Sequence, residues 1–228
     1  MWVRILEIPT VPDLRERISS LSPENRIAFE KMLHERLGTA TALSKISRRI
    51  PADSTPVSFA QQRLWFLHQF DPASPLYNIP AALPLKGLIS TRALEYSFNE
   101  IVRRHEVLRT TFATENGEPV QIIASELKVP LPVRDLRSLD VSQRQDEAKL
   151  LSIVEARQPF DLSTGPLLRT TLLRLGEEEH LLLLTMHHIV SDGWSMEILF
   201  RELRVLYEAS CAGRLSPLPE LTRCTANT

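Results

Sequence analysis

Two adjacent histidines, His187 and His188, are the residues of this sequence whose type and surroundings best suit chemistry. They end a long apolar segment, and Asp192 and Gly193 follow at a turn toward a helix, a place where proteins often build sites. Neighbouring strand residues face opposite ways, so one imidazole is expected to face a cavity and the other the supporting structure. Histidine exchanges protons near neutral pH. His188 is therefore the predicted proton-handling residue.

Asp192 and Gly193 are predicted to shape the turn that follows the histidines. Gly193 can adopt a positive φ, and the Asp192 carboxylate can pair with a buried cation. Arg63, within an otherwise apolar helical segment, is the candidate for that cation. A metal ion would need more ligands than His188 and Asp192, so no metal site is expected. The remaining histidines are expected in the core or on the surface: His34, His68, His105 and His180.

Capping residues and apolar spacing predict helices that alternate with strands. Ser58–Gln61 has the S-x-x-Q form of a capping box, Asn116-Gly117 favours a tight hairpin, and Ser195 is expected to cap the last helix. Helices are predicted at about 58–70, 91–102, 142–158 and 196–209, and strands at about 81–88, 107–113, 119–123, 167–175 and 180–189. The buried residues of the helix at 58–70 are expected to be either Leu64, Leu67 and Phe70 or Trp65 and Phe66. The alternation indicates the α/β class.

The chain divides into five predicted segments, of which one forms the main lobe. Residues 1–20 are a leader without an assigned element, 21–38 an amphipathic helix, 39–55 a linker, 56–220 the lobe and 221–228 an irregular tail. The amphipathic helix has two possible roles that the sequence leaves open. It either packs on its own domain or docks on a neighbouring protein segment.

Composition excludes several classes of protein. The 27 lysines and arginines balance 28 acidic residues, so the net charge of -1 gives no field for nucleic acid or an anionic membrane. Cys211 and Cys224 have no C-x-x-C spacing, which argues against a disulfide framework and suits a reducing cytoplasm. Even the longest apolar runs, such as Leu181–Leu184, are far too short to span a bilayer of about 30 Å. We therefore expect a cytoplasmic protein with no membrane or nucleic-acid partner.

Three motifs together resemble the condensation domains of nonribosomal peptide synthetases. In chain order they are Ser58–Leu67, Arg104–Phe112 and His187–Ser195. Asp71-Pro72 and Tyr77–Pro80 are also similar to the family. The histidine motif is shared with the wider chloramphenicol acetyltransferase-like superfamily, so the first two motifs carry the specificity. The resemblance extends over about residues 21–218.

The resemblance implies a chloramphenicol acetyltransferase-like lobe, a mixed sheet with packed helices, that would form one arm of a V. Peptidyl or acyl carrier protein domains would present substrates on phosphopantetheine in the channel between two lobes, next to neighbouring synthetase domains, with no cofactor bound directly. His188 would be the active-site histidine, Asp192 would form a salt bridge with Arg63, and the Gly193 backbone would lie near the reacting centre. The reaction would join a thioester donor to an aminoacyl acceptor as an amide. Ile189–Ser191, together with Tyr77–Pro80, is similar to the subtype with an L-aminoacyl or peptidyl donor.

Only the N-terminal lobe of such a domain is recognisable, because the next motif of the family does not appear after Pro219–Leu221. A lobe without its partner would leave the site open to water, so the chain alone is expected to form no amide product. Its bare apolar interface is expected to cause self-association. Two rivals remain: a related acyltransferase with an alcohol acceptor or a coenzyme A donor, and a non-catalytic remnant that binds carrier proteins or docks on a neighbour.

Overall fold

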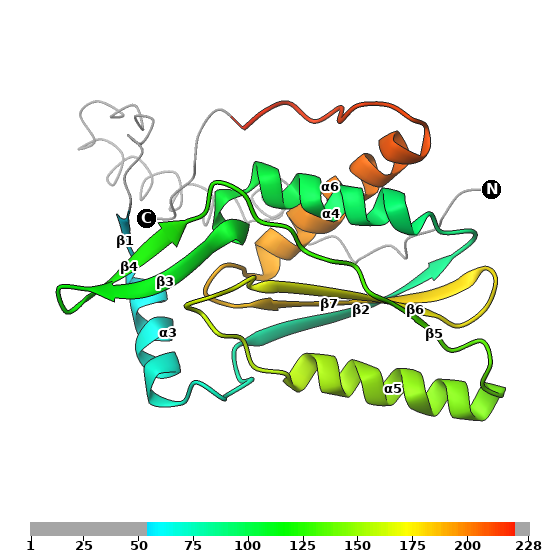
Figure 1. Cartoon of the computed structure of the whole chain (residues 1–228), viewed down its shortest axis with the longest axis horizontal. Coiled ribbons are helices and arrows are strands. Elements are labelled where there is room, and N and C mark those ends of the chain that lie inside the picture. The colour runs from blue at the N-terminus through cyan, green and yellow to red at the C-terminus, as the bar shows by residue number, and fades with distance from the viewer. Residues whose placement is uncertain (1–53, 222–228) are drawn as a thin grey trace, which may run out of the picture. The chain divides into compact units, whose positions relative to one another are not determined.

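A mixed four-stranded sheet is the centre of the structure, a computed structural model that describes residues 54–221. Its strands are β2 (Asn78–Lys86), β5 (Val133–Asp135), β6 (Leu168–Arg174) and β7 (Glu179–His187), in the order β2–β7–β6–β5. β7 is antiparallel to both β2 and β6, whereas β5 and β6 are parallel (Figure 1). The mixed sheet confirms the predicted α/β class.

Strand β7 contains four consecutive leucines, Leu181–Leu184, because both faces of the sheet are covered. Leu182, Leu184 and Met186 belong to the core on one face, and Leu183 to the core on the other, where Leu181 also packs. A central strand buried on both faces carries consecutive rather than alternating apolar residues. The long apolar run of the sequence is thus explained by two cores that share one strand.

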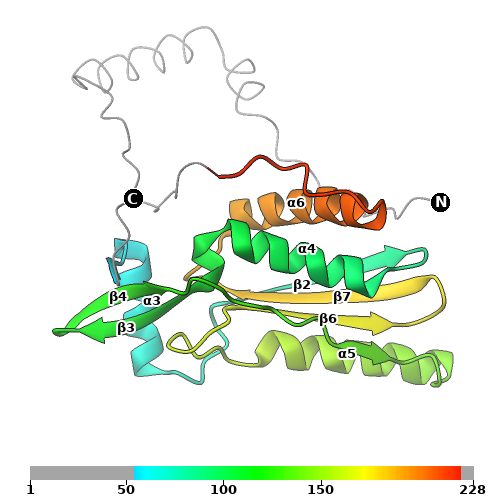
Figure 2. The ribbon, with the colours of Figure 1, turned by 45° about the horizontal axis from the view of Figure 1, so that its top comes forward.

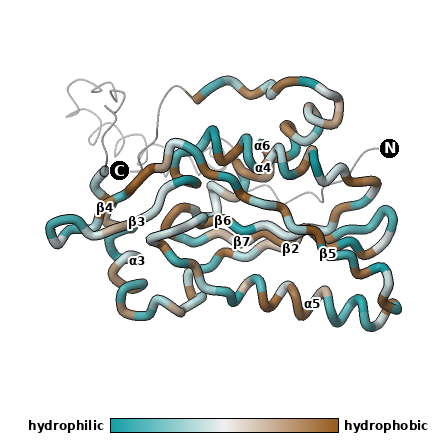
Figure 3. Tube along the Cα trace, in the orientation of Figure 1, coloured by the Kyte–Doolittle hydropathy of each residue, from teal (hydrophilic) through white to brown (hydrophobic). Residues whose placement is uncertain are grey.

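Helices cover both faces of this sheet (Figure 2). α4 (Thr91–Arg104) and α6 (Gly193–Cys211) pack together on one face, and α5 (Val141–Arg157) lies on the other. The larger core contains side chains from α4 and α6: Phe98, Ile101, Val102, Leu199, Leu203 and Leu206. Apolar and hydrophilic residues alternate along α5 (Figure 3), which contributes Ala148 to the smaller core. Among residues 54–221, no helix is long and apolar enough to span a membrane.

A three-stranded antiparallel sheet, in the order β1–β4–β3, lies beside α3 (Phe59–Phe70) (Figure 1). Its strands are β1 (Thr55–Pro56), β3 (Thr110–Glu115) and β4 (Glu118–Ile123), and the 3-10 helix η1 (Glu106–Arg109) precedes β3. Asn116 and Gly117 both have positive φ, 53° and 85°, as the predicted tight hairpin requires. Ser58 and Gln61 form the predicted capping box of α3.

Strand β2 begins at Asn78, earlier than predicted, and includes Pro80 and Pro84. Prolines favour a loop, but β2 is an edge strand that pairs only with β7, so a proline can face outward without breaking the ladder. The strand predicted from Val107 was wrong at its start, because residues up to Arg109 form η1. Both differences arise at the ends of elements.

Helix α3 buries one side only, and the prediction for its aromatic residues was partly wrong. Trp65 is buried, as one alternative expected, whereas Phe66 and Phe70 are 68% and 85% exposed. Arg63 is exposed as well, on a helix that covers the small sheet with a single face. The leader, the amphipathic helix at 21–38, most of the linker at 39–55 and residues 222–228 of the tail lie outside the described residues.

Candidate active site

The two histidines lie at the end of β7, before a short loop that leads into α6. His187 is buried, with 4% of its surface exposed, while His188 is exposed. This is the division that their adjacent positions predict. The loop is closed by a hydrogen bond from the Val190 amide to the His187 carbonyl, 3.1 Å long.

His188 is held by its backbone and by one ring nitrogen. Its amide donates to the carbonyl of Tyr77 at 2.8 Å, and its Nδ1 lies 2.7 Å from the carbonyl oxygen of Ser191. A carbonyl only accepts, so Nδ1 carries the proton in this contact and Nε2 of the neutral ring is an acceptor. The exposed imidazole can therefore take a proton at Nε2 while Nδ1 fixes its orientation.

His187 has a structural environment. Its Nδ1 accepts a hydrogen bond from the Ile189 amide at 3.1 Å, and its ring lies 6.1 Å from that of Phe160 in an edge-to-face arrangement. Burial, then the nearby charges of His68 and His188, lower the pKa of His187 to about 4. The ring is thus neutral at physiological pH and supports the turn that carries His188.

We predict that acid destabilises the fold through His187. Its pKa in the folded protein, about 4, lies below the ordinary value of 6.5, so only the unfolded chain binds the proton between these pH values. The free energy of unfolding is therefore highest above pH 6.5. It falls as pH falls toward 4, by on the order of 2–3 kcal/mol, because the unfolded chain gains the proton first. Unfolding free energies measured from pH 7 to 4 should fall less steeply in His187→Gln than in the wild type. Equal slopes would contradict the prediction.

Asp192 is the N-cap of α6, in place of the predicted Ser195. Its Oδ1 accepts from both the amide and the hydroxyl of Ser195, each at 2.7 Å, and these bonds, followed by the His188 charge, lower its pKa. Within residues 54–221 Arg63 forms no ion pair with Asp192, so the predicted pairing is not formed. Asp192 is exposed, and its carboxylate is satisfied by the cap without a buried cation.

Gly193 is the first residue of α6 and does not have the predicted positive φ. A Cβ at this position would meet no described heavy atom within 4 Å. The turn therefore needs no glycine for its backbone conformation. The glycine instead leaves open space beside the loop that carries His188.

The cap predicts how substitutions at Asp192 and Arg63 affect stability. Asp192→Asn should change the unfolding free energy by less than about 0.5 kcal/mol because asparagine caps as well as aspartate, whereas Asp192→Ala should lose about 1 kcal/mol. Arg63→Gln should be neutral, as expected for an exposed residue. Chemical denaturation measures all three. A loss in Arg63→Gln equal to that in Asp192→Ala would instead support the ion pair.

The contact between the first motif and the histidine loop is made by two residues, Gln61 and Trp65, for which the sequence did not predict this role. Gln61 Nε2 donates to the Ile189 carbonyl at 3.3 Å, while its Oε1 accepts from the Ser58 amide at 3.0 Å. Trp65 packs in one cluster with Ile189 and Val190. The capping box identified Gln61 as a cap, but only the fold shows that the same side chain also reaches the loop.

Comparison with known proteins identifies the family. The sequence model of the family described as "Condensation domain" matches residues 52–224 of this chain. The chain belongs to the condensation domain family. It is 46% identical over 211 residues to phosphinothricin tripeptide synthetase PhsC of Streptomyces viridochromogenes, covering 92% of this chain and 19% of that protein. It is 48% identical over 186 residues to chondramide synthase cmdD of Chondromyces crocatus, covering 81% of this chain and 5% of that one.

Solved condensation domains share the fold. The first condensation domain of the CDA synthetase superposes with a TM-score of 0.67 at 25% identity, over 74% of this chain and 43% of that one. The starter condensation domain of rhizomide synthetase RzmA gives a TM-score of 0.68 at 24% identity, over 75% and 41%. The chain thus spans less than half of these structures, and the N-terminal lobe with its acetyltransferase-like fold is the part that it matches.

In this condensation domain, the second motif joins α4 to α6 through buried charges. Glu202 of α6 lies 2.9 Å from His105 Nε2 and 3.4 Å from Arg104 Nε. The Arg104 side chain is 2% exposed and that of Glu202 10%. Burial raises the pKa of Glu202, but hydrogen bonds and charges from His105 and Arg104 outweigh it, so the net shift is downward. His105 was expected in the core or on the surface, and it is a hydrogen-bond partner of Glu202.

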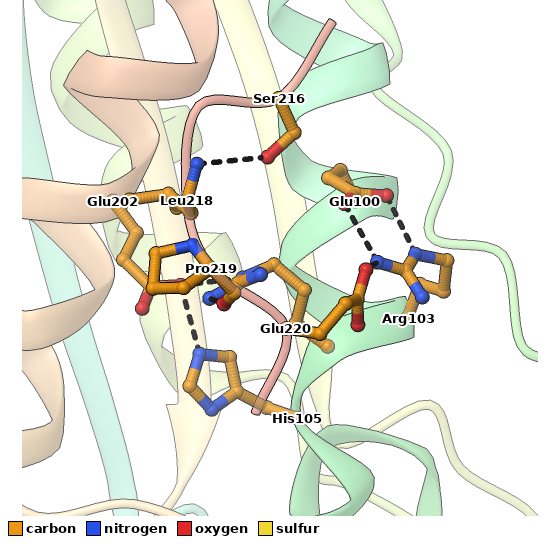
Figure 4. Close-up of polar contacts among 9 residues, drawn as sticks. Glu100, Arg103, His105, Glu202, Ser216, Leu218, Pro219 and Glu220 are labelled. Atoms are coloured by element: carbon orange, nitrogen blue, oxygen red, sulfur yellow. Dashed lines mark hydrogen bonds and ion pairs between the residues drawn. The ribbon is translucent and has the colours of Figure 1, made fainter. Parts of the chain in front are cut away.

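The segment after α6 returns to α4 at the same place (Figure 4). Arg104 Nη2 donates to the Pro219 carbonyl at 3.0 Å, and Arg103 points toward Glu100 and Glu220. The second motif therefore holds α6 and also the segment that follows α6. The first turn of α6 comes directly after the histidine loop. Across residues 54–221, no three His, Cys, Asp or Glu side chains gather as metal ligands.

Proposed function

We propose that this lobe supplies the proton-handling histidine for amide-bond formation between two carrier-bound substrates. The observation that supports this proposal is the exposed His188, whose Nδ1 is held by the Ser191 carbonyl so that Nε2 is available. The amine of an aminoacyl acceptor attacks the thioester carbonyl of the donor, and a C–N bond forms. The C–S bond then breaks, and the donor's phosphopantetheine leaves as a thiolate. The amine proton goes to that thiolate, and Nε2 either carries it there as the base or orients the amine.

A single histidine is sufficient for this chemistry. An α-amine titrates at about 7.7–8.0, so a substantial neutral fraction is present near physiological pH, and a thioester is already activated. Alignment of two tethered substrates can contribute on the order of 7–11 kcal/mol, more than a general base supplies. His188 therefore acts either as the base or as the group that orients the amine.

The space beside Gly193 is consistent with this role. The glycine lies five residues after His188, and its missing side chain leaves room for a substrate to approach the loop. Phosphopantetheine arms of peptidyl or acyl carrier protein domains would bring the substrates there, beside neighbouring synthetase domains and in the cytoplasm. Ile189–Ser191 and Tyr77–Pro80 favour an L-aminoacyl or peptidyl donor.

The test is a chimeric domain in which residues 52–224 replace the matching segment of a complete related condensation domain. Donor and acceptor carrier proteins loaded with the substrates of that domain are mixed with it, and mass spectrometry detects the amide. We expect a product that requires both carriers. A folded chimeric domain that binds carriers without turnover would support a carrier-binding remnant, and product formed only with an alcohol or from coenzyme A would support a related acyltransferase.

A further inference from the structure

The C-terminal end of α5 is held from two sides, by the Asn78 side chain of β2 and by the Arg169 side chain of β6. The last carbonyls of a helix have no partners within the helix. Asn78 Nδ2 donates to the carbonyls of Ala156 and Gln158, both at 2.8 Å. Arg169 Nη2 donates to the carbonyls of Glu155 and Gln158, at 3.1 and 2.8 Å. The end of the helix is thus fixed in place by β2 and β6.

Asn78 occupies a special position relative to His188. It is the cross-strand partner of His187 in the pairing of β2 with β7. The preceding residue, Tyr77, provides the carbonyl that accepts the His188 amide at 2.8 Å. The two bonds from the Asn78 side chain therefore anchor the backbone that holds His188.

The same helix end also reaches His187. The Arg169 guanidinium lies 3.8 Å from the centre of the Phe160 ring, and that ring in turn meets the His187 ring at 6.1 Å between their centres. Arg169 Nε binds the Glu155 carboxylate at 2.8 Å. Both neighbours of the histidine pair, the Tyr77 backbone and the Phe160 ring, are connected to the end of α5.

We propose that Asn78 is a positioning residue for His188, which it holds through the Tyr77 carbonyl by anchoring β2 to the end of α5. The catalytic effect of this positioning rests on the proposed function of His188, whereas the effect on the His188 backbone amide does not. Asn78 touches no reacting atom, and it acts on the orientation of the histidine. Removal of the Asn78 side-chain amide should make the start of β2 more mobile. The hydrogen bond from the His188 backbone amide to the Tyr77 carbonyl should then open more often.

Asn99 provides a matched control. Its Nδ2 donates to the carbonyls of Glu95 and Val129 at 2.9 and 3.0 Å, and its Oδ1 accepts from the Val129 amide at 2.9 Å. This asparagine in α4 thus makes the same kind of bonds, without any to the histidine loop. Its replacement by alanine removes at least as many hydrogen bonds as the replacement of Asn78.

The experiment compares Asn78→Ala and Asn99→Ala in the full chain by hydrogen exchange of the His188 amide in NMR spectra. We expect exchange about tenfold faster in Asn78→Ala, as the loss of anchoring bonds predicts, and unchanged in Asn99→Ala. Asn78→Leu, which keeps the approximate size and removes both donors without adding a charge, should behave as Asn78→Ala does and serves if the alanine variant does not fold. Equal exchange rates in the Asn78 and Asn99 variants would overturn the proposal.

A second measurement separates positioning from stability. In the chimeric domain, Asn78→Ala should lower kcat about tenfold at unchanged KM, as for an interaction that matters in the transition state, while Asn99→Ala leaves both unchanged. Faster amide exchange together with a wild-type chimeric domain that forms no amide would refute the proposed function and leave the positioning role intact. Faster exchange at unchanged kcat would refute the positioning role alone.

Discussion

Amide formation by the chimeric domain is expected to fall by about 10²- to 10⁴-fold when His188 is replaced by alanine, the range typical for loss of a general acid–base. The reason lies in the two ring nitrogens: Nδ1 is bound to the Ser191 carbonyl, and only Nε2 is available to the amine. Single-turnover measurements with pre-loaded carriers give the rate of the chemical step. If His188 handles the proton, added imidazole restores part of the rate.

The control for this experiment is His180→Gln. His180 lies at the opposite end of β7 and is buried, so its replacement disturbs the same strand without touching the loop. The chemical rate should stay within about twofold of the wild type once the folded fraction is taken into account, as for a site far from the chemistry. A rate in His188→Ala that equals the rate in His180→Gln would contradict a role for His188 in the reaction.

Replacement of Glu202 by alanine is expected to lower the unfolding free energy by about 3–5 kcal/mol. Arg104 is almost fully buried, and the variant leaves its charge without its carboxylate. Breaking a buried pair in this way costs far more than the pair contributes over an apolar replacement. Domains have only about 5–15 kcal/mol of stability, so the variant should unfold at a clearly lower urea concentration.

Two further variants show whether the unpaired charge is the cause. Glu197→Ala removes an exposed glutamate from the same helix and should change the unfolding free energy by about 0.5 kcal/mol or less. The double variant Arg104→Met, Glu202→Met removes both charges and should lose less than Glu202→Ala alone. A loss in Glu202→Ala no greater than in Glu197→Ala would show that the network contributes nothing to stability.

Local signals in the sequence predicted the elements that depend on neighbouring residues. Asn116-Gly117 is sufficient for its hairpin, because the positive φ of both residues belongs to that turn. The cap at Ser58 was predicted for the same reason, since the serine bonds an amide three residues along the chain. The opposite exposure of His187 and His188 follows from strand geometry alone.

Contacts between distant residues explain what the sequence did not predict. Asp192 and Ser195 are both capping residues, and the structure uses Asp192 because Ser195 donates to it from within the first turn. Arg63 was expected on the buried side of α3. The apolar pattern of this helix fits two faces equally well, and the structure buries Trp65 and leaves Arg63 exposed. Glu202 is separated from Arg104 by 98 positions, so nothing in its own segment marks it as buried.

The prolines of β2 limit the addition of a further strand at this edge of the sheet. Pro80 and Pro84 have no N–H to offer an incoming strand, so two of the outward backbone positions of this edge carry no donor. Natural sheets protect their edges from unwanted pairing by such means. The opposite edge, β5, has only three residues and no proline. A strand as short as β5 also offers few donors, so both edges of the sheet limit the addition of a further strand.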